Sequence, residues 1–590
     1  MSGSKATALR RNASRRCIGL YAATAKFRTS NRRDRPRTAA WADRYGGKFD
    51  AVRKLIDDSI EAKRQSLAAE WRSRRNRWVA AIVAVAAILG VGAWFAMLEK
   101  GRQEGIDISA MTSAKSLLKD VLDAYSDKSL DLAGAESLAT ISGQFLNDTR
   151  AASKTSAADL VWAQALNVDA DLQAKLSRNT EALALARKAK EAAQSLTQSR
   201  PNDREPLQAL YDASIRVGTA LSALGRAHKD DALKEYNAAL GTAETIVSLS
   251  SDEVGDDDVI DAHMKIGDIH KDNDLKQYSQ ARTEYQFGLA ACQAALAKHP
   301  QSFNLLRDKG KAFFRIAQLL STEKTQGTFD EAATFYRQAS EVQEALVTRN
   351  AQDALASQKA PDASLKSNLA ATYTNWGVLE KDGGDLKLAL VKLQQGVALH
   401  EELTKDEPGN PQWEEYLAPS YLYIAETLDG LNRPDEALAY YRKLADARRT
   451  LAYRSLGRPN AQKELAQAAQ LLGDRSAGLA QIEAYRESVR TWNRLVDDPR
   501  IATAAADQYD VVMGFAKAFD AQKDWPDAQA AYRVAMKVAV LNYVKDPSNT
   551  AWRDKAEEAE RDAVVAAGQA AQSAPADAPH PARSAPVSSP

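Results

Sequence analysis

Small and apolar positions recur with a period of about fifty residues through the last two thirds of the chain. The most regular member of the pattern is an alanine, which in several periods is followed four residues later by a tyrosine. Apolar positions at helical spacing within such a period predict a stack of helix pairs that bury their apolar faces against their neighbours. The alanines are Ala182, Ala232, Ala281, Ala332, Ala389, Ala437, Ala480 and Ala528, and the tyrosines are Tyr236, Tyr285, Tyr336, Tyr441 and Tyr532.

Two periods show the internal order of the pattern most clearly. In each, a small residue precedes the alanine, Gly377 before Ala389 and Ala425 before Ala437. Because antiparallel helices approach closely only where side chains are small, we expect each small residue to contact the alanine that follows it. The residues expected in repeat packing are Ala182, Ala232, Gly267, Ala281, Ala332, Gly377, Ala389, Ala425, Ala437, Tyr441, Ala528 and Tyr532.

Turn-forming residues separate the predicted helices. Proline stops the outgoing helix, and a following Asn, Asp or Ser can cap the next one. We therefore place the repeat region at 156–567 and an unstructured Pro/Ala/Ser-rich tail at 568–590. The turn motifs are Pro201-Asn202-Asp203, Pro300-Gln301-Ser302, Pro408-Gly409-Asn410, Pro459-Asn460 and Pro547-Ser548-Asn549.

The order of aromatic, small residue, alanine and second aromatic resembles the tetratricopeptide repeat (TPR). The period near fifty exceeds the usual thirty-four residues of that family, and longer second helices and loops account for the difference. Within the family, the chain is similar to bacterial membrane-anchored proteins with long TPR units, which often carry a cytoplasmic TIR or kinase domain. The residues before the apolar segment at 78–98 are too few for either domain, and no kinase motif is present.

The resemblance implies that partners bind along the concave face, which the first helix of each unit forms. A Lys and Asn pair with which family members hold a partner's terminal carboxylate is missing from these positions, so chaperone tails are not expected ligands. The groove positions transferred to this chain are Asp261, Met264, Asp268, Lys271, Lys311, Phe314, Gln318, Ala371, Thr374, Val378, Lys381, Leu422, Glu426 and Asp429. Solvated helix faces are the alternative interpretation of the same residues.

Residues 78–98 contain no charged side chain. At 1.5 Å per residue, a helix of this length reaches about 31 Å, enough to cross a bilayer. Trp78 and Trp94 lie near its ends, where indole rings favour the membrane boundary, and arginines cluster on the N-terminal side only. We therefore predict a transmembrane helix with a cytoplasmic N-terminus and an extracytoplasmic repeat region, periplasmic in a Gram-negative cell. A buried core helix and a cleaved signal peptide are the alternatives.

The charge is divided unevenly along the chain. The net charge is +1, but residues 1–77 contain 21 Lys and Arg against 7 Asp and Glu, so the head carries +14 and the remainder −13. We expect a disordered basic head at 1–47, an amphipathic juxtamembrane helix at 48–77 and a helical stalk at 99–155. A transit peptide, or a segment that binds nucleic acid or anionic lipid, would share the composition of the head.

The sequence shows no constellation of catalytic residues. It lacks a zinc-protease motif, a nucleophile elbow and a phosphate-binding loop, and its two cysteines, Cys17 and Cys292, cannot form a cysteine zinc site. His263 and His270 lie at helical spacing beside several aspartates, which makes a metal-dependent hydrolase conceivable. Helix capping by those aspartates is the simpler interpretation.

Together these patterns predict an all-α fold, a right-handed superhelical solenoid of antiparallel helix pairs preceded by one transmembrane helix. The expected function is that of a membrane-anchored scaffold that binds protein or peptide partners, without catalysis, cofactor, metal or nucleic acid. Small residues along the membrane helix also allow a homodimer. The alternative is a signal transducer whose short cytoplasmic head is part of a TIR-like domain.

Overall fold

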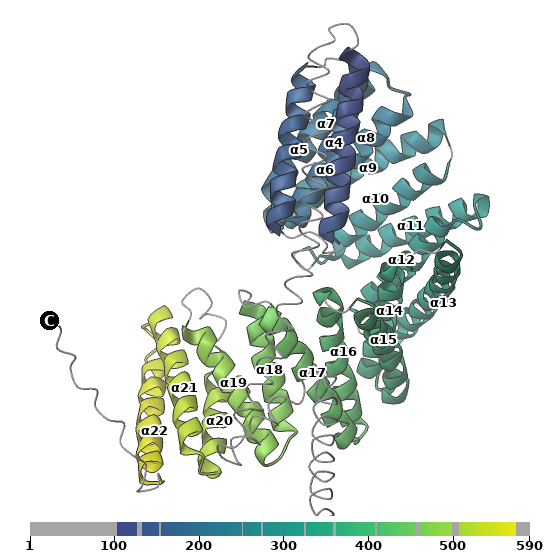
Figure 1. Ribbon diagram of the computed structural model, residues 1–590. Coiled ribbons are helices and arrows are strands. Elements are labelled where there is room, and N and C mark those ends of the chain that lie inside the picture. Colours follow the sequence, from purple (N-terminus) through teal and green to yellow (C-terminus); the bar gives the residue numbers. More distant parts are fainter. Residues whose placement is uncertain are drawn as a thin grey trace, which may run out of the picture.

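The computed structural model is an array of α-helices joined by short turns, and its described residues contain no strand (Figure 1). The structure describes residues 103–126, 132–152, 155–250, 252–272, 275–323, 326–357, 361–407, 410–454, 459–497 and 507–573. The α-helices are α4 (Gln103–Ser126), α5 (Leu132–Ala152), α6 (Ser156–Lys175), α7 (Asn179–Ser199), α8 (Arg204–Ala223), α9 (Lys229–Leu249), α10 (Glu253–Lys271), α11 (Tyr278–Lys298), α12 (Phe303–Leu320), α13 (Gln326–Ser357), α14 (Ala363–Gly383), α15 (Leu386–Asp406), α16 (Pro411–Gly430), α17 (Pro434–Arg454), α18 (Pro459–Asp474), α19 (Leu479–Asp497), α20 (Tyr509–Ala521), α21 (Trp525–Lys545) and α22 (Ala551–Ser573).

Each period of the sequence forms one pair of helices. From α6 to α21, an even-numbered first helix packs against the odd-numbered second helix that follows it. Most second helices have 21 residues, as in α7, α9, α11, α15, α17 and α21, and the first helices of the early units have about as many. These lengths, with short turns between them, explain why the period is near fifty residues.

Glycines let the two helices of a pair approach. A β-carbon added at Gly267 of α10 would lie 2.5 Å from Cε1 of the Tyr285 ring on α11, and one added at Gly218 of α8 would lie 2.6 Å from the same atom of Tyr236 on α9. Such distances are shorter than van der Waals contact, so only glycine fits beneath each ring. The tyrosine of the Ala-x-x-x-Tyr pattern therefore covers the glycine of the preceding helix.

The side chain nearest to Gly377 is that of Leu393, one helical turn beyond Ala389, the residue that the sequence predicted as its contact. The atoms nearest to a β-carbon added at Gly377 belong to Leu393, the closest being Cγ at 2.6 Å. Side chains on a helix lean toward its N-terminus, so the residue four positions later covers the turn that contains Ala389. Ala425, Ala437 and Tyr441 lie together in one buried core.

The repeating alanines lie in the first two turns of the second helices. Seven of them are at most 2% exposed, from Ala182 to Ala528. Ala480 is the exception, because it is exposed at the start of α19, where Ile482 takes the buried position instead. The assignment of Ala480 to the buried series was wrong, because Ile482 is the fourth residue of α19, the place that the repeating alanine holds in α7, α9, α11, α15, α17 and α21.

Polar groups complete the ends of the helix pairs. The hydroxyl of Tyr285 donates a hydrogen bond to Asp268 at 2.7 Å, and that of Tyr441 donates to Asp429 at 2.9 Å. Of the predicted caps, Asp203 accepts a hydrogen bond from the backbone N–H of Glu205, and Ser302 accepts one from Leu305. Buried hydroxyls and free helix ends thus find partners within the repeat.

The first helices form one side of the array, which we call the inner face. The first helices α6 and α8, α10 and α12, and α14 and α16 contact one another across neighbouring units, whereas the second helices from α7 to α17 lack comparable contacts. In a curved stack, the helices on the concave side lie closer together. The C-terminal part differs, because there the second helices α19 and α21 contact each other.

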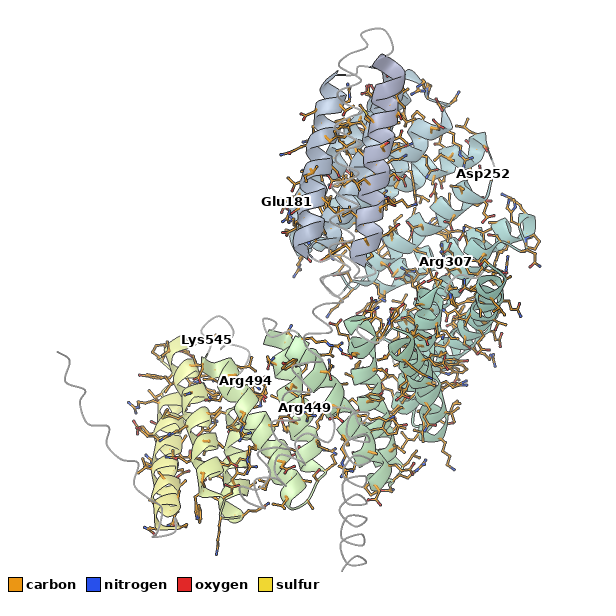
Figure 2. The ribbon with its side chains drawn as sticks, in the orientation of Figure 1. Glu181, Asp252, Arg307, Arg449, Arg494 and Lys545 are labelled. Carbon is orange, nitrogen blue, oxygen red and sulfur yellow. The ribbon has the colours of Figure 1, made fainter. Side chains whose placement is uncertain are left out.

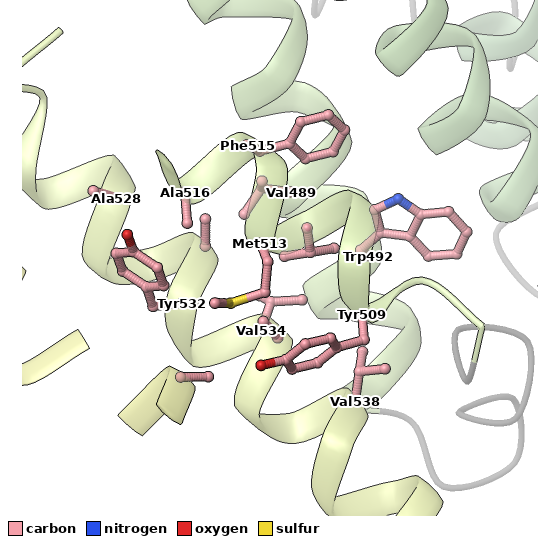
Figure 3. Close-up of a cluster of buried hydrophobic side chains, with 14 of the residues drawn as sticks. Val489, Trp492, Tyr509, Met513, Phe515, Ala516, Ala528, Tyr532, Val534 and Val538 are labelled. Atoms are coloured by element: carbon pink, nitrogen blue, oxygen red, sulfur yellow. The ribbon is translucent and has the colours of Figure 1, made fainter. Parts of the chain in front are cut away.

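Several cores follow one another along the array. The C-terminal core joins α18 to α22, and Trp492, Tyr509, Met513 and Tyr532 fill it (Figure 3). The rings of Tyr485 and Phe515 stack there with centroids 4.6 Å apart. Each core draws residues from neighbouring units, as expected when single units cannot bury their own apolar faces.

Both ends of the predicted repeat region extend further than expected. In the segment predicted as a stalk, α4 and α5 share a buried core with α6, with Met111, Leu118, Leu146 and Leu172 among its members. At the other end, α22 continues to Ser573, beyond the predicted limit at 567. The described parts of these segments therefore join the helical array.

Among the described helices, none has an apolar stretch long enough to cross a membrane. The predicted transmembrane helix at 78–98, with Trp78 and Trp94, lies outside the described residues, as do the basic head at 1–47 and the amphipathic segment at 48–77.

Charged side chains join successive units, and Arg449 and Asp252, which take part in such pairs, are labelled in Figure 2. Arg449 of α17 binds Glu487 of α19 with two contacts of 2.6 Å, and Asp252 pairs with Arg204 of the preceding unit. Many such pairs connect residues about one repeat apart, so opposite charges at that separation belong to the repeat pattern.

Candidate functional site: an acidic cavity on the inner face

The inner face contains an open cavity of about 370 Å³ where three units meet. Helices α6, α8 and α10 supply most of its walls, and Ala182 of α7 adds to them. A volume of this size is typical of a site for a small ligand or for side chains of a peptide. The lining residues are Ala170, Asp171, Ala174, Ala182, Tyr211, Asp212, Ile215, Arg216, Thr219, Ala220, Asp257, Asp258, Asp261 and Lys265.

Arg216 holds the α6 and α8 walls together. Its Nη2 donates to Asp171 of α6 at 2.8 Å, and its Nη1 donates to the backbone carbonyl of Asp212 at 2.9 Å and lies 3.4 Å from the Asp212 carboxylate. The Arg216 side chain is only 23% exposed. Two carboxylates therefore already neutralise this guanidinium.

Polar bridges span the gap between α8 and α10. The Tyr211 hydroxyl donates to the backbone carbonyl of Asp258 at 2.9 Å, and Gln208 donates to the Asp258 carboxylate at 2.7 Å. The backbones of α6 and α8 approach each other closely, whereas those of α8 and α10 do not. Long side chains bridge the wider spacing, and the space between the bridges forms the cavity.

The cavity is strongly acidic. Five aspartates line it, against Arg216 and Lys265. Burial raises the pKa of Asp258 to about 7, and the nearby Asp212 and Asp261 carboxylates add to the shift. Burial also raises the pKa of Asp212. These shifts arise because carboxylates crowded in a partly desolvated space disfavour ionisation.

The sequence-predicted groove residues on α10 have different environments. Asp261 lines the cavity and is half exposed, but Met264 is only 4% exposed and belongs to the core, so its assignment to an open groove is wrong. Asp268 accepts a 2.9 Å bond from Arg315 of α12, and Lys271 binds Gln318. Asp268, Lys271 and Gln318 therefore connect two units.

The remaining groove positions on α12 and α14 have varied environments. On α12, Lys311 pairs with Asp308 at 2.7 Å, and the Phe314 ring lies 6.1 Å from that of Tyr336. On α14, the Thr374 hydroxyl is buried and has no hydrogen-bond partner. Ala371 is partly exposed on the same helix.

The predicted groove on α14 and α16 is likewise closed by contacts between units. Lys381 pairs with Glu426 at 2.6 Å, and Asp429 accepts a 3.1 Å bond from Arg475, which directly follows α18. Val378 and Leu422 pack against a buried core. These residues meet as expected for one face of the array, but they form bridges and packing contacts.

Most of the cavity was missed, although a signal for it exists in the sequence. The groove positions on α10 lie at defined offsets from Gly267, and the same offsets from Gly218 give Asp212, Ile215 and Thr219. All three line the cavity. The spacing from Gly218 to Ala232 equals that from Gly267 to Ala281, so the same offsets identify these cavity residues from the sequence.

The two histidines considered as metal ligands contact different partners. His263 lies 2.8 Å from Glu284, and His270 lies 2.6 Å from Gln277. Throughout the part of the chain that the structure describes, no group of three or more His, Cys, Asp and Glu residues could hold a metal ion. His263 and His270 therefore do not belong to one set of metal ligands among the described residues.

The chain has a TPR-like architecture, as the glycine and tyrosine contacts between paired helices show. No protein-family model matches it, and no curated protein matches it. Solved structures resemble it at low identity. The apo form of RapI has 13% identity and a TM-score of 0.41, with 73% of this chain and 98% of that chain covered.

Two further structures are similarly distant. The apo form of the quorum sensor NprR from B. thuringiensis has 14% identity and a TM-score of 0.37, covering 72% of this chain and 98% of its own. A signal transduction ATPase with a tetratricopeptide repeat sensor, PH0952 from Pyrococcus horikoshii, has 12% identity and a TM-score of 0.38. The match covers 70% of this chain and 54% of that chain. Similarity at this level assigns no ligand or activity to the present chain.

Proposed function

We propose that this chain is a scaffold that binds protein or peptide partners along the inner face of a right-handed superhelical solenoid. The observation that carries the proposal is the open cavity between α6, α8 and α10. Elsewhere on this face, the predicted groove residues are mostly engaged in bridges between units, whereas the cavity leaves polar groups open to a ligand. A repeat array presents such a surface without supplying catalytic groups.

The same proposal includes a membrane anchor at residues 78–98. Its support is the uncharged 21-residue segment, with arginines on its N-terminal side. Alkaline extraction of membranes, combined with a reporter fused to the C-terminus, tests the anchor and its orientation. Release of the full chain into the soluble fraction would refute the anchor, and a cytoplasmic C-terminus would refute the orientation.

Site-specific crosslinking in intact cells tests partner binding. A photoreactive residue at Asp261, which is half exposed at the cavity, reports on the inner face, and one at Lys234, whose side chain is 77% exposed on α9, serves as the control. We expect a discrete crosslinked band from position 261 and none from position 234. Equal capture at both positions, or no capture at either, would contradict binding through the inner face.

A further inference from the structure

We propose that the cavity between α6, α8 and α10 binds a cationic amine or guanidinium group, carried by a Lys or Arg side chain of a partner segment or by a free polyamine. This inference rests on the proposed function, because it names the chemistry of the ligand that the inner face would bind. Two observations support it independently, the balance of charge around the cavity and the hydrogen-bonding groups left without partners.

Two of the five aspartates that line the cavity lack a counter-ion among the described residues. Arg216 is already held by Asp171 and Asp212, and Lys265 lies 4.0 Å from Asp261. Asp257 and Asp258 form no ion pair with any residue that the structure describes. An incoming cation would meet uncompensated carboxylates in a partly desolvated space, where charge attraction is stronger than in water. An anion would meet repulsion.

Unpaired hydrogen-bond acceptors point to the same chemistry. The buried atoms Asp257 Oδ1 and Gln208 Oε1 have no hydrogen-bond partner, and Gln208 joins the cavity wall through Asp258. Among the described residues that line the cavity, the one buried donor without a partner is Arg216 Nε, whose guanidinium is already held by Asp171 and Asp212. Ammonium and guanidinium groups supply several donors and no acceptor, so they match the unpaired acceptors Asp257 Oδ1 and Gln208 Oε1.

Apolar side chains complete the match to a basic side chain. Ala174, Ile215 and Ala220 line the cavity beside the carboxylates. Lysine and arginine carry a chain of methylene groups that packs on apolar surface while the charged end reaches polar partners. The walls therefore offer contacts to both parts of such a side chain.

Proton release should accompany this binding. Burial raises the pKa of Asp258 to about 7, and burial together with the neighbouring Asp308 raises that of Asp257. A bound cation favours the ionised carboxylates, so binding should tighten as the pH rises from about 6 to about 8. The charged groups facing this pair are Asp212 and Arg204 of α8, Asp261 of α10, and Arg307, Asp308 and Lys311 of α12.

The test measures binding of a fluorescent, end-blocked hexalysine peptide and of spermidine to the full chain in nonionic detergent. The double variant Asp258→Asn with Asp261→Asn removes two cavity charges, and we expect it to weaken hexalysine binding about tenfold. The control variant Glu557→Gln with Glu560→Gln removes two exposed charges on α22 and should bind as the wild type does. Arg216→Gln frees two carboxylates and should tighten binding.

These outcomes decide the proposal. Weaker binding in the cavity variant, an unchanged control and tighter binding in Arg216→Gln, with unaltered helical circular dichroism, would support it. Selectivity for hexalysine over spermidine would indicate a partner segment as the source of the cation, and the reverse would indicate a polyamine. Binding of neither probe, or equal loss in the cavity and control variants, would overturn the proposal. Crosslinking from position 261 could still succeed in that case, which would leave the proposed function intact.

Discussion

Substituting alanine for Gly267 gives the most direct test of how the helix pairs pack. The added β-carbon would lie 2.5 Å from Cε1 and 2.6 Å from Cδ1 of the Tyr285 ring. Tyr285 is fully buried, and its hydroxyl is held by Asp268 at 2.7 Å, so the ring cannot turn away without losing that bond. The methyl group must therefore displace a fixed ring or separate α10 from α11.

The magnitude follows from opposing effects. Replacing glycine by alanine inside a helix favours folding by about 1 kcal/mol. Overpacking costs about 1 to 3 kcal/mol, and loss of the tyrosine hydrogen bond costs about 1 kcal/mol more. We expect Gly267→Ala to lower the free energy of unfolding by about 1 to 3 kcal/mol, the sum of these terms.

The control is Gly241→Ala on the exposed side of α9, where an added β-carbon meets no atom within 4 Å. This change should stabilise the protein by about 0.5 to 1 kcal/mol, because only the helix preference acts. Urea unfolding followed by circular dichroism, with hydrogen exchange of α10 and α11, measures both variants. A Gly267→Ala protein as stable as Gly241→Ala would refute the reasoning. Partial rescue by Tyr285→Leu would identify the ring as the cause.

Three further predictions concern other buried groups. Burial lowers the pKa of His400 to about 4, so the unfolded chain binds its proton more tightly. The free energy of unfolding should therefore fall by roughly 3 kcal/mol as the pH drops from about 6.5 to about 4. In a His400→Leu variant this part of the pH dependence should be absent when urea midpoints are compared across pH. Ser302→Ala removes the cap of α12 and should cost about 1 kcal/mol in urea unfolding, and an unchanged midpoint would contradict the capping role. Cys292 is buried and burial raises its pKa to about 12, so in a Cys17→Ser protein the thiol should react with a disulfide reagent only after unfolding, and fast reaction in the native state would contradict its burial.

The repeat itself was readable from the sequence because its causes are local. Alanine or glycine is required where two helices touch, an aromatic ring fills the space beside the small residue, and Asp203 or Ser302 caps the next helix. These requirements recur in each unit and leave a periodic pattern. They account for the all-α architecture and for the buried alanines.

The details of register needed the tertiary structure. The side chain nearest to Gly377 is that of Leu393, since side chains lean back along the helix, and Ala480 is exposed because Ile482 is the residue at the buried position of α19. Neither effect changes the composition or the period of the sequence. Both depend on where a helix begins and on the direction of its side chains.

The candidate site shows the same division. The sequence showed that acidic residues gather on α10, and its resemblance to the TPR implied that first helices line one face. The tertiary structure decided which of them meet a ligand, because α8 and α10 stay apart while α10 and α12 approach closely. Asp268 and Lys271 are therefore used in bridges, whereas Asp258 and Asp261 line an open cavity. The distance between neighbouring backbones arises from the packing of whole units, which no single helix encodes.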